Sequence, residues 1–242
     1  MINHQYTKKT EGVQIKSIFR ISGVILAGGA NKRFNGMAKA NIVIDGKTII
    51  SRIIDTIRDI FDEIIIVTNT PEEFKEYTDF KLVSDQFLKV GPLGGIHAAL
   101  KASSKEALFV FAGDMPLLNK ELIIRQIDYY NNHKCDILIP RIDQYIEPLH
   151  AIYNISLCRT LEEYLTGDHD YAVREFIKRV NVSYLQFEGS EETKNAFTNI
   201  NSPSDISIVE KILGLPAGRQ GFADHDYFFQ PAFISGGTGR LH

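Results

Sequence analysis

The chain has 242 residues, of which 44% are hydrophobic and 24% are charged, and its formal net charge is −3. These values are ordinary for a globular protein of one large α/β domain or two small ones. The small negative charge gives no electrostatic reason to expect binding to nucleic acid or to a membrane surface. Two cysteines, Cys135 and Cys158, are too few and too far apart for a disulfide framework or a zinc site.

The chain termini show no targeting or membrane signal. No apolar run approaches the roughly 18 residues that a bilayer span needs, and the N-terminal MINHQYTKKTEG has no apolar signal region. We therefore expect a cytoplasmic protein. Residues 1–20 are predicted to be a polar lead-in of the kind that is often mobile. Residues 214–242 are rich in glycine and aperiodic, which predicts an irregular tail.

Between these ends, short β-rich runs alternate with helical patterns. Runs such as EIIIVT and ALFVFA lack polar alternation, which is typical of strands covered on both faces. Strands are expected over residues 23–27, 63–68, 81–84, 107–112, 136–140, 149–153 and 182–187. Helices are expected from residue 48 along a stripe of isoleucines, from Pro71, and over 94–102, 120–131, 156–165, 171–179 and 203–213. This order predicts one doubly wound α/β domain over residues 21–213, with helices on both faces of the sheet.

The first predicted strand ends at Ala27 and runs into the loop LAGGANKRFNGMAK. Ligands of open α/β sheets bind at the carboxyl ends of strands. Gly28 and Gly29 let backbone N–H groups approach an anion, and Arg33 and Lys39 can neutralise phosphate oxygens. The loop matches neither GxxxxGK[ST] nor GxGxxG, so a plain basic loop stays open as an alternative.

Two further stretches carry polar groups at strand ends. In FAGDMPLL, Asp114 follows a buried strand, where one carboxylate together with water and phosphate oxygens can hold Mg²⁺. A helix cap or a turn is the alternative there. In SDQFLKVGPLGGIHAAL, Asp85 can accept hydrogen bonds from a ribose or a base edge. Gly94 and Gly95 belong to a turn before a helix that suits a nucleotide or an anion, whereas His97 is more typical of packing than of catalysis.

The stretches EPLHAIY and FTNINSPSD complete the set of candidate site segments. Asn199 and Asn201 can face one site, because residues two apart in an extended chain share a side. Ser202 with Pro203 also fits the start of a helix.

The ordered set LAGG-x3-RF-x-G-x2-K, GPLGGI, GDMPLL, EPLHAIY and FTNINSPSD resembles the molybdenum cofactor guanylyltransferases. This resemblance covers roughly residues 21–213. It implies a three-layer α/β/α, Rossmann-like fold with a mostly parallel central sheet. It further implies that GMP passes from GTP to the phosphate of molybdopterin, free or molybdenum-bound, with Mg²⁺ as cofactor and release of pyrophosphate. Other molybdenum cofactor biosynthesis proteins or molybdoenzyme chaperones become candidate partners.

The resemblance also implies roles for single residues. Backbone groups of four residues would bind GTP, namely Leu26, Ala27, Gly28 and Gly29. Lys39 would contact phosphate with Arg33 nearby, and Asn69 and Asp85 would contact the nucleotide. Asp114 would bind magnesium, and Asn199 and Asn201 would lie near the metal and the pterin phosphate. One position departs from the family pattern, since the family usually has Asp before the loop lysine and this chain has Ala38.

Several alternatives stay open at this stage. A cytidylyltransferase for the same pterin, or an enzyme for a sugar or alditol phosphate, would share the fold. A catalytically silent GTP-binding module is favoured by Ala38. An NAD-dependent oxidoreductase is poorly supported, because GxGxxG is absent after the first strand. The implied transfer needs no general base, since a phosphate monoester is largely dianionic near pH 7 with a second pKa of about 6.

Overall fold

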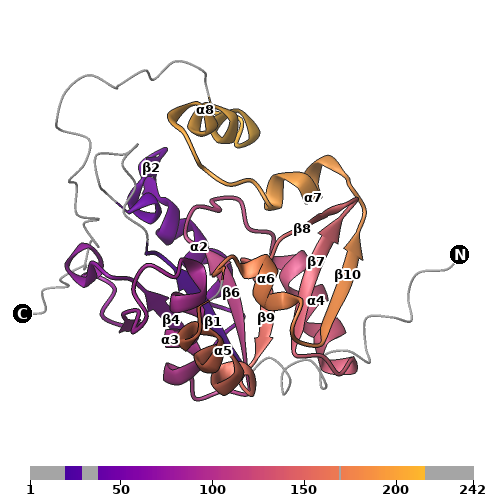
Figure 1. Cartoon of the computed structure of the whole chain (residues 1–242). Coiled ribbons are helices and arrows are strands. Elements are labelled where there is room, and N and C mark those ends of the chain that lie inside the picture. Colours follow the sequence, from indigo (N-terminus) through magenta and orange to yellow (C-terminus); the bar gives the residue numbers. More distant parts are fainter. Residues whose placement is uncertain (1–19, 29–37, 169, 216–242) are drawn as a thin grey trace, which may run out of the picture.

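The structure, a computed structural model, describes residues 20–28, 38–168 and 170–215 (Figure 1). The rest of the chain lies outside the described residues, including Gly29, Arg33 and most of the predicted lead-in and tail. The domain boundaries expected at residues 20 and 214 therefore stay predictions. None of the described helices is both long enough and apolar enough to cross a membrane.

Eight strands within the described residues form one central sheet in the order β10-β7-β9-β6-β1-β4-β5, with β8 paired to β7. Pairs that involve β8 or β9 are antiparallel and the others are parallel, so the expected mostly parallel sheet is confirmed. The strands are β1 (Ile21–Leu26), β4 (Ile64–Val67), β5 (Lys81–Val83), β6 (Ala107–Ala112), β7 (Ile137–Ile142), β8 (Tyr145–Ile146), β9 (His150–Asn154) and β10 (Val182–Phe187).

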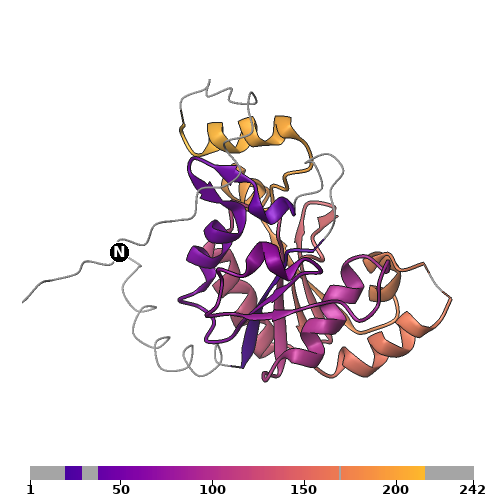
Figure 2. The same ribbon diagram turned by 90° about the vertical axis from the view of Figure 1, so that its left-hand side faces the viewer.

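Helices cover both faces of this sheet, which confirms the three-layer arrangement (Figures 1 and 2). The helices on the two faces are α2 (Ile49–Ile57), α3 (Pro92–Ala102), α4 (Lys120–Asn132), α5 (Leu157–Thr166) and α6 (Val173–Ile177). Two further helices, α7 (Glu191–Ala196) and α8 (Pro203–Ile212), lie at the upper end of the sheet in Figure 1. Successive side chains of a strand point to opposite faces. Phe109 and Phe111 of β6 accordingly pack in one core cluster with α2 and α4, whereas Leu108 and Val110 pack in a second cluster with α3, α5 and α6.

Some local elements differ from the sequence-based expectation. The helix predicted at Pro71 is only a 3-10 turn, η3 (Pro71–Phe74), with Phe74 fully buried. A second 3-10 turn, η2 (Lys39–Asn41), leads into a hairpin of β2 (Val43–Ile44) and β3 (Lys47–Thr48) that the apolar pattern did not reveal. Strands of two residues and the six-residue α7 are too short to show a periodicity.

The strand order places a topological switch point beside β1. After β1 the chain builds β4 and β5 on one side, and then crosses to β6 on the other side of β1. Ligands of doubly wound folds bind outside the carboxyl ends of strands at such a point. The sheet therefore directs a ligand to the ends of β1 and β6, after Leu26 and Ala112.

Candidate active site

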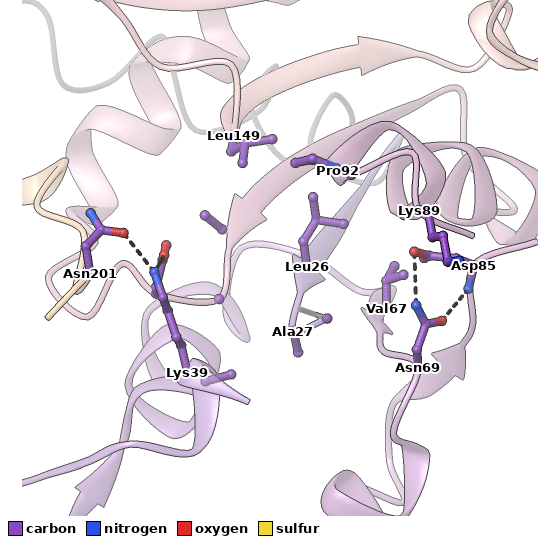
Figure 3. A pocket seen from close by; sticks show the side chains of 17 residues that line it. Leu26, Ala27, Lys39, Val67, Asn69, Asp85, Lys89, Pro92, Leu149 and Asn201 are labelled. Carbon is purple, nitrogen blue, oxygen red and sulfur yellow. Dashed lines mark hydrogen bonds and ion pairs between the residues drawn. The ribbon is translucent and has the colours of Figure 1, made fainter. Parts of the chain in front are cut away.

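A pocket with a volume of about 630 Å³ lies at this switch point (Figure 3). Its wall comes from the ends of β1, β4 and β6, from η2, from the loop between β5 and α3, and from the segments before β9 and α8. Nine of the predicted site residues line it: Leu26, Ala27, Gly28, Lys39, Asn69, Asp85, Gly95, Asp114 and Asn201. The volume is within the usual range for pockets of small ligands and cofactors.

Three polar side chains meet on one side of the pocket, and we name them the lysine end: Lys39, Asp114 and Asn201. The Nζ atom of Lys39 donates to Asp114 Oδ2 at 2.8 Å. It also donates to Asn201 Oδ1 at 2.8 Å (Figure 3). The side chains of Lys39 and Asp114 are only 22% and 21% exposed. An ammonium group carries three N–H donors, so the two bonds to described residues leave a third donor that suits an incoming phosphate oxygen.

Backbone contacts hold the lysine end in place. The N–H of Ile200 donates to the carbonyl oxygen of Asp114 at 2.9 Å, which ties the segment before α8 to the end of β6. Asp205 accepts from the N–H groups of Asn201 and Ser202 at 2.8 Å each, as part of the capping box that starts α8. These bonds hold the pKa of the Asp205 carboxyl below its ordinary value. The predicted helix start at Ser202 is thus confirmed, and it also orients Asn201.

The opposite side of the pocket is formed by Asn69 and Asp85, which we name the asparagine end. Asn69 Nδ2 donates to Asp85 Oδ2 at 3.2 Å, and the N–H of Asp85 donates to Asn69 Oδ1 at 3.0 Å (Figure 3). Burial raises the pKa of the Asp85 carboxyl, against a smaller opposing effect of the hydrogen bond from Asn69. This end therefore presents amide and carboxylate groups, and it lies where β4 and β5 finish.

Glycines bring the backbone close around the pocket. A Cβ atom on Gly113 would lie 2.7 Å from the carbonyl oxygen of Leu26, to which the N–H of Gly113 donates at 3.0 Å. Gly95 lines the pocket beside Leu26 and Asp85, as expected. Gly94 does not line it, and a Cβ atom there would lie 2.7 Å from the carbonyl oxygen of Phe87 in the loop before α3.

Asn199 also departs from the expected arrangement. It does not line the pocket with Asn201; its side chain instead bonds to Glu147, and its Oδ1 atom is buried without a hydrogen-bond partner. The backbone contact of Ile200 with Asp114 and the capping box turn the segment, so the two asparagines do not share one side. Sequence reasoning missed Glu147, whose pKa is raised mainly by burial and further by the charge of Asp114.

Sequence reasoning also missed several described residues that line the pocket, and Lys89 is the cation among them. Lys89 has a φ of +66°, which is uncommon for a residue other than glycine, and Gly91, two positions later, has a φ of +64°. The GPLGG pattern pointed to this turn but not to Lys89. His97 is fully buried and packs edge-on against Phe87 at 5.0 Å, which confirms its interpretation as a packing residue.

The oxygen atoms of the lysine end suit a hard cation. Asp114 Oδ2 and Asn201 Oδ1 already converge on one cationic group, the ammonium of Lys39. Among the described residues, no cluster of three or more His, Cys, Asp or Glu side chains could hold a metal. Mg²⁺ is commonly bound by one or two carboxylates together with substrate phosphates and water. The donor set therefore fits Mg²⁺ carried by a nucleotide, and it does not fit an all-protein metal cage.

Comparison with known proteins agrees with this geometry. Residues 23–184 match the family described as MobA-like NTP transferase domain. The chain is 38% identical over 205 residues to a probable molybdenum cofactor guanylyltransferase of Natranaerobius thermophilus, covering 80% of this chain and 97% of that protein. It is 31% identical over 201 residues to the molybdenum cofactor guanylyltransferase of Desulfosudis oleivorans, with 82% and 98% covered.

A solved structure shows the same fold. The molybdopterin-guanine dinucleotide biosynthesis protein A of Archaeoglobus fulgidus superposes with a TM-score of 0.68 at 26% identity, covering 80% of this chain and 98% of that one. The family match at residues 23–184 spans most of the sheet and all of the described pocket-lining residues except Asn201. The chain belongs to the MobA-like NTP transferase family, and it is a nucleotidyltransferase.

Proposed function

We propose that this chain transfers GMP from GTP to the terminal phosphate of molybdopterin, free or molybdenum-bound, and releases pyrophosphate. The names of the curated relatives support this reaction. The observation that carries it is the position of Lys39, Asp114 and Asn201 at one side of the pocket, opposite Asn69 and Asp85. A nucleoside triphosphate fits between these ends, with its phosphates at the lysine end and its nucleoside at the asparagine end.

The reaction joins two anions. An oxygen of the molybdopterin phosphate forms a bond to the α-phosphorus of GTP, and the bond from that phosphorus to the bridging oxygen of the β-phosphate breaks. The leaving group takes the electron pair as pyrophosphate. The nucleophile is largely dianionic near pH 7, so no side chain has to remove a proton. The main barrier is electrostatic, and the protein contributes positioning and charge compensation.

Lys39 is the described residue best placed for this compensation. Its Nζ atom lies at the pocket wall and its position is set by two hydrogen bonds, so its charge is preorganised toward the phosphates. Asp114 would hold Mg²⁺ through its carboxylate, whose two oxygen atoms can accept from Lys39 and bind a metal ion together. Such an ion, when bound, polarises a phosphate oxygen and compensates charge on the leaving group. Gly28 leaves room for the phosphates, and Gly29 and Arg33 are proposed to assist from the loop.

The asparagine end is proposed to select the nucleoside. Guanine carries N1–H and N2–H₂ donors, and the ribose carries hydroxyl donors, which suit a carboxylate acceptor. Asp85 is such an acceptor, and Asn69 orients it through two reciprocal hydrogen bonds. The expected protein partners and the cytoplasmic location stay predictions.

The deciding experiment is pyrophosphate release in the presence of Mg²⁺ and molybdopterin, run in parallel with GTP, CTP, ATP and UTP. We expect release with GTP, and loss of release when molybdopterin is omitted. Release with CTP alone would assign the chain to cytidylyl transfer instead. A folded protein that binds GTP tightly but releases no pyrophosphate would favour a silent nucleotide-binding module.

A further inference from the structure

Glu73 connects η3 to the turn that carries Lys39. Its Oε2 atom accepts from the backbone N–H of Ala38 at 3.2 Å and from Nδ2 of Asn41 at 3.2 Å. Ala38 and Asn41 stand on either side of Lys39 in the η2 turn. One carboxylate oxygen therefore holds both flanks of the residue whose ammonium group contacts Asp114 and Asn201.

The η2 turn depends on this contact. Its own backbone bonds run from Asn41 N–H to Ala38 O at 3.0 Å and from Ile42 N–H to Lys39 O at 3.0 Å. They leave the N–H of Ala38 without a partner inside the turn, and Ala38 is only 4% exposed. A buried N–H group that loses its acceptor is costly. Position 38 supplies no carboxylate of its own, and Glu73 brings one from 35 positions away.

The segment that carries Glu73 is itself anchored at both sides. The next residue, Phe74, is fully buried in the core. Four residues before Glu73, Asn69 pairs with Asp85 at the asparagine end of the pocket. The five residues from Asn69 to Glu73 therefore link the two ends of the pocket. Through them, the position of Lys39 is tied to the asparagine end, which is proposed to bind the nucleoside.

We propose that Glu73 is a positioning residue, which sets Lys39 for the phosphates of the nucleotide through the η2 turn. The proposal rests on the proposed function for the identity of the nucleotide. It does not require Glu73 to touch the substrate. It requires an acceptor oxygen at this place rather than a negative charge, because both of its partners are N–H donors of neutral groups.

The test compares the affinities of GTP and GMP, measured by calorimetry with Mg²⁺, in four variants. Glu73→Ala removes the acceptor, and Glu73→Gln keeps an acceptor oxygen. Asn41→Ala removes one of the two bonds without altering η3. Glu72→Ala is the matched control, because Glu72 is the exposed neighbour in the same turn. Thermal unfolding of each variant checks that the fold is intact.

We expect Glu73→Ala to lower the affinity for GTP by about tenfold, the scale of one lost preorganised contact. The affinity for GMP should change by less than about twofold. Asn41→Ala should show the same selectivity with a smaller loss. Glu73→Gln should keep most of the GTP affinity, and Glu72→Ala should match the wild type. In the transfer assay, Glu73→Ala should lower kcat more than it raises the KM for molybdopterin.

Three results would overturn the proposal. Equal losses of affinity for GTP and GMP in Glu73→Ala would indicate general damage to the pocket. Wild-type affinity for GTP in that variant would show that Glu73 does not position Lys39. If Glu73→Gln bound GTP as weakly as Glu73→Ala, the negative charge of Glu73 would matter rather than its acceptor oxygen. A failure of the proposed function is seen separately, as a wild-type protein that binds GTP but transfers no GMP. The binding comparison still tests Glu73 in that case.

Discussion

The two ends of the pocket are built in different ways. At the asparagine end, Asn69 and Asp85 are 16 positions apart and follow neighbouring parallel strands. At the lysine end, Lys39 contacts Asp114, which is 75 positions away, and Asn201, which is 162 positions away. Three separate segments of the chain therefore meet there. The asparagine end therefore requires only the pairing of β4 with β5, whereas the lysine end requires distant segments of the domain to be folded together. The ion pair of Lys39 with Asp114 stands at the end that is harder to assemble, where preorganisation is most useful for catalysis.

The largest expected effect follows from Asp114→Ala. We expect it to abolish magnesium-dependent turnover, because the carboxylate that fits the metal is removed and Lys39 loses one of its two partners. The measurement is pyrophosphate release over a Mg²⁺ titration. Asp59→Ala, at an exposed carboxylate with a surface ion pair to Lys120, is the control. An unchanged Mg²⁺ titration in Asp114→Ala would place the metal elsewhere.

Lys39→Ala should come next. Loss of one preorganised charge contact is expected to lower turnover by roughly 10² to 10⁴. The affinity for GMP should change less than the affinity for GTP, since Lys39 is proposed to contact the phosphates that GMP lacks. Lys75→Ala, at an exposed lysine just after η3, serves as the control. Near wild-type turnover in Lys39→Ala would contradict the role given to the lysine end.

Asp85→Asn should act at the other end and mainly on binding. We expect the KM for GTP to rise by about tenfold with kcat nearly unchanged, as for an interaction present equally in ground state and transition state. Because burial raises the pKa of Asp85, the carboxylate gains a proton at a higher pH than an ordinary aspartate. As the pH falls, the KM for GTP should therefore begin to rise above the pH of about 4 at which an ordinary aspartate gains its proton. This rise of the KM at low pH should be absent in Asp85→Asn. If the rise persisted in that variant, another titrating group would be its cause.

A pair of glycine variants should separate stability from function, with the smallest direct effect on chemistry. Gly113→Ala should destabilise the fold by about 1–3 kcal/mol, because the new Cβ would lie 2.7 Å from Leu26 O. Gly28→Ala meets its nearest described atom, Val67 O, only at 3.9 Å, so its stability should be nearly unchanged while GTP affinity falls. Urea unfolding and GTP binding measure the two effects. Equal stability of the two variants would contradict the close approach of β1 and β6.

Much of the fold could be predicted because buried strands have a strong local signature. The apolar runs at Ile64–Val67 and Ala107–Ala112 are hydrophobic throughout, since both faces are covered by helices. Thr48 was predicted at the start of a helix, and its side chain caps α2 by accepting from the N–H of Ser51. Such signals lie within a few residues of each other and need no knowledge of distant contacts.

By itself, the amino-acid sequence determined the α/β class, the order of the longer strands and helices, and the family to which the chain belongs. It also marked the polar residues at strand ends, from Lys39 to Asn201. Only the tertiary structure decided that Asn201 lines the pocket with Lys39 while Asn199 bonds to Glu147. It alone brought Lys89 to the pocket and Glu73 to the η2 turn. The physical reason is that strand and helix propensities act over a few residues, whereas these contacts join segments tens of positions apart, whose approach is set by the packing of the sheet.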